Sequence, residues 1–131
     1  NIGNDGIDFS GSKSTVLNSH FNNIGDKAIS IGELSEVNIS NIETKNSYIG
    51  IVSKDGSNAF VNNVQFINVE IPFAAYQKKN EYSFATMSIN NIKSDNYLIK
   101  SIRDNESKIF EDNNEIGKFD ENILLVINKK N

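Results

Sequence analysis

The chain has no cysteine and no tryptophan, and only one proline, one methionine and one histidine among 131 residues. Without cysteine, nothing in the chain requires an oxidising compartment and nothing excludes one. The longest apolar run, Ile123 to Ile127, has five residues and is interpreted as a strand. A membrane-spanning helix needs about 18 such residues. We therefore expect no membrane span.

A basic face is also missing. The formal net charge is −4, whereas a nucleic-acid interface needs a cluster of lysine and arginine. The composition, 37% hydrophobic and 23% charged, is that of a globular protein. No calcium-binding nonapeptide is present, and Asp55-Gly56 and Asp104-Asn105 are interpreted as ordinary turns. No metal and no cofactor is expected.

Asparagine, in contrast, is abundant and recurs at fixed intervals. It occupies the fifth and the tenth position of a ten-residue pattern at residues 37–46, 59–68 and 87–96, with a weaker copy at 14–23. The two columns are Asn18, Asn41, Asn63 and Asn91, and Asn23, Asn46, Asn68 and Asn96. Both columns step by 23, 22 and 28 residues. This shared step indicates an internal repeat.

The repeat predicts an all-β fold, a right-handed parallel β-helix of about five coils with 22–23 residues per coil. Each repeat contains short runs in which apolar residues alternate, such as Ile29-Ser30-Ile31 and Ile49-Gly50-Ile51. The repeats are too short for a crossover helix plus two strands. A leucine-rich solenoid is the main competitor, but isoleucine and valine prevail here. Five coils would make a rod about 24 Å long.

The asparagine columns fit tight bends between strands. Asparagine tolerates the left-handed conformation, and stacked asparagine side chains can bond from coil to coil. We therefore predict an asparagine ladder. On this interpretation Asn63→Ala leaves buried partners unpaired and costs about 1–3 kcal/mol.

Residues 1–131 are expected to form one β-helix domain, with 113–131 as a C-terminal coil or cap that includes Ile123 to Ile127. The chain begins Asn1-Ile2-Gly3, without an initiator methionine and one strand before the first complete repeat. We expect it to be part of a longer protein. An open solenoid end exposes unpaired backbone groups, so further coils, other domains or another chain are possible partners there, oligomers included.

Two stretches carry a family resemblance: Asn4-Asp5-Gly6-Ile7-Asp8, and Gly25 to Gly32 on the next coil. They resemble successive coils of pectin-lyase-like right-handed β-helix proteins. Short segments similar to Ser53-Lys54-Asp55 occur in β-helix repeat regions of bacterial secreted or surface proteins. Some of those proteins carry spore-coat CotH-like or lamin-tail modules. The resemblance implies an extracellular or cell-surface location.

Polygalacturonase-type hydrolases share that fold, and their motifs are N-x-D, D-D, G-H-G and R-x-K. Asp5 or Asp8 matches the first, but Lys27 follows Asp26 where the second carboxylate would stand. No G-H-G exists, and Asp104 follows Arg103. One carboxylate would lack its partner. A lyase would instead use Asp5, Asp8 and Asp26 to hold Ca²⁺, with a lysine or arginine base. No catalytic residue is assigned.

The fourth coil contains about six extra residues, roughly Tyr76 to Tyr82. Long loops on rigid scaffolds often carry binding residues. The candidate binding residues are Tyr76, Lys78, Lys79, Tyr82 and Lys54, with Lys27 nearby. Tyrosine rings suit sugar stacking and lysines suit an acidic glycan. A solvated loop without a ligand is the simpler alternative, and His20 is expected to be a surface residue.

The leading hypothesis is a non-catalytic β-helix module of a larger secreted or cell-surface bacterial protein. It would act as a rigid scaffold and could bind carbohydrate or a protein partner. The alternative is a fragment of a polysaccharide-active enzyme, either a lyase, a hydrolase or an epimerase. Three or more ionisable groups converging on one strand face would favour the enzyme.

Overall fold

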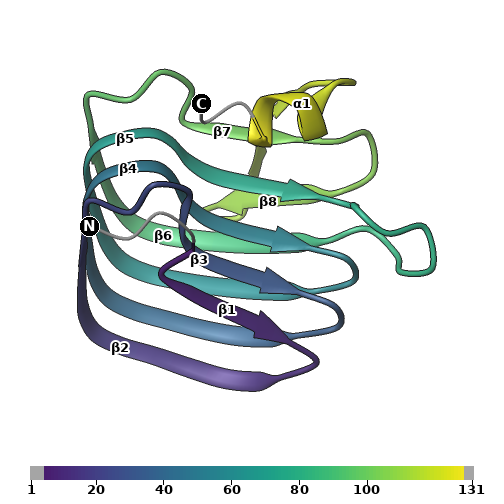
Figure 1. Cartoon of the computed structure of the whole chain (residues 1–131), viewed down its shortest axis with the longest axis horizontal. Coiled ribbons are helices and arrows are strands. Elements are labelled where there is room, and N and C mark those ends of the chain that lie inside the picture. The colour runs from purple at the N-terminus through teal and green to yellow at the C-terminus, as the bar shows by residue number, and fades with distance from the viewer. Residues whose placement is uncertain (1–4, 129–131) are drawn as a thin grey trace.

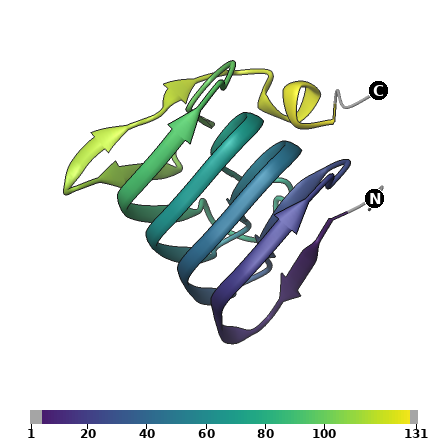
Figure 2. The same ribbon diagram turned by 90° about the vertical axis from the view of Figure 1, so that its left-hand side faces the viewer.

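The chain winds into a β-solenoid of about five turns, as Figures 1 and 2 show. The structure is a computed structural model, and it describes residues 5–128. Its elements are β1 (Ile7–Ser10), β2 (Lys13–Asn22), β3 (Lys27–Gly32), β4 (Glu36–Lys54), β5 (Asn58–Tyr76), β6 (Thr86–Asp95), β7 (Ser101–Arg103), β8 (Lys108–Glu111), β9 (Asn114–Ile116), β10 (Lys118–Phe119) and α1 (Ile123–Ile127).

Pairing between coils is parallel and follows the predicted repeat. Val16 pairs with Ile39, Ile39 with Val61, and Val61 with Ile89. These partners are 23, 22 and 28 residues apart, the steps of the asparagine columns. β4 and β5 each have 19 residues and bend twice, so one continuous strand covers most of a coil. The prediction of a parallel solenoid with this register is confirmed.

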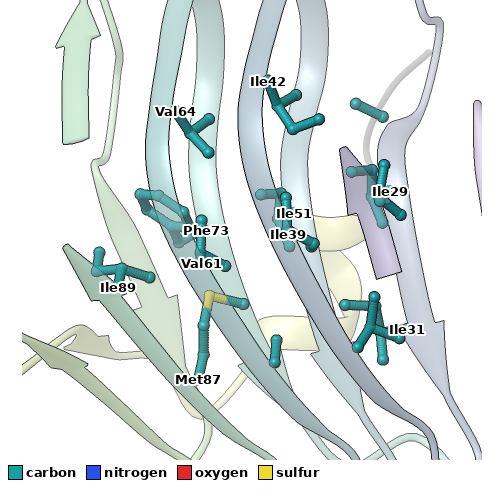
Figure 3. Packing of buried hydrophobic residues seen from close by; sticks show 14 of the residues in the cluster. Ile29, Ile31, Ile39, Ile42, Ile51, Val61, Val64, Phe73, Met87 and Ile89 are labelled. Atoms are coloured by element: carbon teal, nitrogen blue, oxygen red, sulfur yellow. The ribbon is translucent and has the colours of Figure 1, made fainter. Parts of the chain in front are cut away.

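Apolar residues stack inside the coils to form the main core (Figure 3). Ile29, Ile39, Ile51, Val61 and Ile89 are all buried there. The aromatic rings of Phe66 and Phe73 meet edge to face, with centroids 5.1 Å apart. Stacking is what buries these side chains, because a single coil has no interior of its own.

Ile49 and Ile71 depart from the predicted alternation. They belong to a second apolar cluster with Val52, Ile102 and α1, on the outer face of the strands. Gly50 separates Ile49 from the inward-facing Ile51, and a Cβ at Gly50 would overlap the ring of Phe66. The ring of Phe66 fills the space where a side chain at position 50 would lie, and the side chain of Ile49 points outward.

The asparagine ladder is present. All eight column residues have positive φ, between 51° at Asn18 and 63° at Asn96. Asn41 Nδ2 donates to Asn18 Oδ1 at 2.9 Å, Asn63 Nδ2 donates to Asn41 Oδ1, and Asn68 Nδ2 donates to Asn46 Oδ1 at 3.2 Å. The left-handed conformation turns the strand at each of these positions, and asparagine tolerates it well.

Two details of the ladder were predicted wrongly. Asn91 donates to Asn62 rather than to Asn63, and Asn46 donates to Asn22 rather than to Asn23. The amides are also exposed to solvent rather than buried. Water can therefore replace a lost partner, and the cost predicted for Asn63→Ala cannot come from buried unpaired groups.

Buried coil-to-coil hydrogen bonds belong instead to a serine column, which the sequence pattern did not reveal. Ser35 Oγ accepts the backbone N–H of Ser12 at 3.0 Å, and Ser57 Oγ accepts that of Ser35 at 3.1 Å. At the corresponding turns before β6 and β8, Ser107 Oγ accepts the N–H of Ala85 at 3.0 Å. These serines lie at the turn before each strand and satisfy backbone donors that the parallel ladder does not reach.

The two ends of the solenoid differ. At the C-terminal end β8 and β9 form an antiparallel hairpin, whose turn residues Asp112 and Asn113 have φ of 49° and 67°. Two successive positive φ values match the type I′ turn that suits a hairpin. At the N-terminal end, within residues 5–128, β1 pairs only with β3 and β2 only with β4.

The run Ile123 to Ile127 is a helix, α1, and the interpretation as a strand is wrong. Ile123 and Ile127 are buried and lie four residues apart, on one face of the helix. That face packs on Val52, Ala74 and Ile102 of the outer strand face. Contact with this apolar face therefore outweighs the strand preference of isoleucine and valine. Within the described part of the chain, no helix has the length and apolar character needed to cross a membrane.

Ser57→Ala should destabilise the protein by about 1–3 kcal/mol, because the buried N–H of Ser35 loses its acceptor. Urea unfolding of both proteins measures the difference. Ser88→Ala, on an exposed strand position, is the matched control and should change stability by less than about 0.5 kcal/mol. Equal effects of the two substitutions would contradict the role of the serine column.

Asn63→Ala should cost about 1–2 kcal/mol more than Asn63→Gly, since alanine at a φ of 58° is strained and glycine is not. Both variants lose the same side-chain hydrogen bonds, so their difference isolates the backbone conformation. Thermal and urea unfolding give the comparison. If both variants lose the same stability, the amide ladder and not the bend determines the preference for asparagine.

Candidate functional site

Two turn carboxylates, the buried Asp55 and the half-buried Asp104, fix the loop between β5 and β6. Asp55 Oδ1 accepts the backbone N–H groups of Lys78 and Lys79 at 2.7 and 2.8 Å, and the Asp55 residue is 0% exposed. Asp104 Oδ2 accepts the N–H of Gln77 at 2.7 Å. These bonds to ionised groups are among the stronger protein hydrogen bonds. The loop therefore has a defined path.

Tyr76 cannot serve as a sugar-stacking residue. It is the last residue of β5 and only 1% exposed, packed in the second apolar cluster. Burial raises the pKa of its hydroxyl, and the negative charges of Asp26 and Asp5 raise it further. Tyr82 is half-buried, and its carbonyl accepts a hydrogen bond from Gln77 Nε2. The ring of Tyr76 is therefore not available beside the lysines, whereas the hydroxyl of Tyr82 lies near enough to Lys79 to act on its pKa.

Lys79 is held in an ion pair across two coils. Its Nζ lies 2.6 Å from Glu33 Oε2, and Ser10 Oγ donates to Glu33 Oε1 at 2.7 Å. The hydrogen bond from Lys79, followed by that from Ser10, lowers the pKa of Glu33. Hydrogen bonding to Glu33 likewise raises the pKa of Lys79. Lys79 therefore serves first to tie the loop to the scaffold.

Lys54 and Lys78 remain as positive charges without an ion pair to any described residue. The stem of Lys54 lies over Gly32, where an added Cβ would come within 2.8 Å of Lys54 Cε. Burial lowers the pKa of Lys54, and the nearby charges of Lys78 and Lys27 lower it further. We call Lys54 and Lys78 the lysine pair.

The carboxylates that sequence analysis grouped do lie together, but a lysine stands between them. Lys27 is 8% exposed, with its Nζ 3.0 Å from Asp26 Oδ2 and 3.8 Å from Asp5 Oδ1. Burial raises the pKa of Asp5, opposed by the charge of Lys27 and reinforced by Asp26 and Asp8. Across residues 5–128 no three acidic, histidine or cysteine side chains converge on a possible metal position.

A further hollow of about 480 Å³ follows the first asparagine column along the bend. His20, Glu43, Gln65 and Lys93 line it from successive coils. His20 is a surface residue, as predicted: its side chain is 78% exposed, and Nδ1 lies 3.3 Å from Glu43 Oε1. Both polar and apolar side chains line this hollow, and none of them is a predicted binding residue.

Comparison with models of protein families, with curated proteins and with solved structures gave no match to this chain. The solenoid itself supports the β-helix part of the family resemblance. The finer assignment to pectin-lyase-like proteins stays a hypothesis.

Sequence analysis missed the role of Asp55 and Asp104 and classed both as ordinary turn residues. A usable signal was there. The two aspartates lie in corresponding turns, one coil before and one coil after the insertion begins, with Asp104 in the register of Lys54 rather than of Asp55. A carboxylate at such a turn can accept the backbone N–H groups of an adjoining loop.

Asp55→Ala should release the loop, because the N–H groups of Lys78 and Lys79 lose their acceptor. Limited digestion with trypsin, which cuts after lysine, should then cleave at these lysines much faster than in the parent protein. Asp95→Ala, an exposed aspartate on β6, is the matched control and should digest at the parental rate. Unchanged digestion of Asp55→Ala would contradict the anchoring role.

Proposed function

We propose that this chain is a non-catalytic, pectin-lyase-like β-helix module of a larger extracellular or cell-surface bacterial protein. It serves as a rigid scaffold and binds an acidic carbohydrate at the lysine pair. The ligand class is a glycan that carries uronate or sulfate groups.

The observation that carries this proposal is the lysine pair beside a fixed loop. Neither amine forms an ion pair with a described residue, although the charges of Asp8 and Asp5 act on Lys54. Lys54 lies half-buried near Lys78, and like charges held near each other are unfavourable until an anion lies between them. A carboxylate or sulfate would supply that anion. The backbone of Lys78 is anchored by Asp55, so little ordering is needed on binding.

The rival function, a polysaccharide lyase, also has one specific observation in its favour. Asp5, Asp8, Asp26, Lys27 and Lys54 lie on neighbouring coils at one strand face. A lysine with a lowered pKa is a better proton acceptor near neutral pH. Lys54 would then take the proton next to the uronate carboxyl group. Catalysis predicts an unsaturated product, which simple binding does not give.

The test is a titration of the protein with a uronate oligosaccharide, followed by calorimetry. Lys54→Ala and Lys78→Ala should each weaken binding about threefold to fivefold, and the double variant about tenfold or more. Lys93→Ala, an exposed lysine on β6 far along the coil, removes the same charge and should bind as the parent does. Binding should weaken with added salt.

The pH dependence gives an independent readout. Because the pKa of Lys54 is lowered, its charge is lost at a lower pH than the charge of an exposed lysine. Binding should therefore decline as pH rises through that lowered pKa, and Lys54→Ala should lack this step. No binding of uronate or sulfate oligosaccharides, or equal binding by the double variant, would refute the proposal. Accumulation of unsaturated uronate would favour the lyase.

A further inference from the structure

A second hollow follows the other asparagine column, at the opposite end of the outer strands from the lysine pair. It comprises two adjoining cavities of about 690 and 400 Å³, which share Asn68, Glu70 and Leu98. Tyr48 lines the first and Tyr97 the second. We call this combined hollow the tyrosine groove.

Both walls of the tyrosine groove are held by hydrogen bonds. The carbonyl oxygen of Glu70 accepts the N–H groups of Leu98 at 2.9 Å and Ile99 at 3.1 Å, which fixes the segment that carries Tyr97. On the other side Tyr48 Oη donates to the carbonyl of Val126 in α1. The groove thus exists before any ligand arrives.

The polar groups of the groove still have free bonding capacity. Asn68 donates one N–H to Asn46 and accepts one from Asn96, at 3.2 and 2.5 Å. A primary amide has two donors and two acceptor positions, so each ladder amide can also bond to a ligand. The hydroxyl groups of a sugar ring are suited to such amides.

The negative charge of Glu70 in the groove favours one class of sugar over another. Glu70 is exposed and has no ion pair with any described residue. Its charge acts on Tyr48, whose pKa is raised first by burial and then by Glu70 and Asp26. A carboxylate beside aromatic rings favours a cation and disfavours an acidic ligand. Tyr97 is 45% exposed, so its ring is available for stacking.

We propose that the tyrosine groove binds an amino sugar, with its protonated amine at Glu70 and its hydroxyl groups on the ladder amides. Tyr97 stacks against the sugar ring. This site is separate from the lysine pair and does not depend on the function proposed above.

The probe is a trimer of glucosamine, and the matched ligand is the trimer of N-acetylglucosamine, in which acetylation removes the positive charge. Chemical-shift titration by NMR should perturb the amides of Glu70 and Leu98. The glucosamine trimer should bind about fivefold more tightly than the acetylated one, and Glu70→Gln should abolish that difference. Tyr97→Ala should weaken both trimers about threefold.

Glu115→Gln, at an exposed carboxylate of β9, makes the same change in net charge and should keep the parental preference. The variant that lacks both Lys54 and Lys78 should also bind the glucosamine trimer normally, which separates this site from the uronate site. Equal binding of the two trimers, an unaltered preference in Glu70→Gln, or no binding at millimolar concentration would each overturn the proposal.

Discussion

Parallel backbone pairing between coils one repeat apart is the interaction on which this structure depends. β4 and β5 pair along nearly their whole length, from Glu36 with Asn58 to Lys54 with Tyr76. Each coil contacts mainly its neighbours, and its apolar side chains are buried only because the next coil lies over them. A shift of one residue would turn inward side chains outward. Register therefore determines both the backbone bonds and the core.

The bends protect that register. Asparagines with positive φ turn the strand at the same two places in successive coils, and buried serines satisfy donors at the third turn. The fourth coil accommodates its insertion because the asparagine columns resume beyond it, with Asn91 and Asn96 again in the left-handed conformation. The extra residues leave the stack at one edge, where Asp55 and Asp104 hold them.

The two proposed binding sites include residues that lie where the repeat is interrupted. Lys78 is supplied by the insertion, and Tyr97 and Leu98 by the segment that leaves the regular path before β7. The columns that repeat faithfully, such as Ile39 with Val61, are occupied by packing. Apolar side chains within the repeat are needed by the next coil, whereas polar residues at its bends and edges, such as Asn68, Glu70 and Lys54, are at least partly exposed.

The fold could be predicted from the sequence because the repeat is local and periodic. Asn41 and Asn63 need positive φ in every coil, and the residue type shows it directly. The fate of Tyr76 was not visible, because its burial depends on the C-terminal segment, which folds back over the outer strand face as α1. The turn position of Asp55 was visible in the sequence, but the backbone groups that it accepts lie in a loop whose path the sequence does not specify.

NMR of the unmodified protein tests the central claim most directly. Methyl cross-peaks should link Ile39 with Val61 and Val61 with Ile89, residues that sit one coil apart in parallel register. Their absence, or cross-peaks that indicate antiparallel pairing of β4 with β5, would contradict the solenoid and the two proposed binding sites that depend on it.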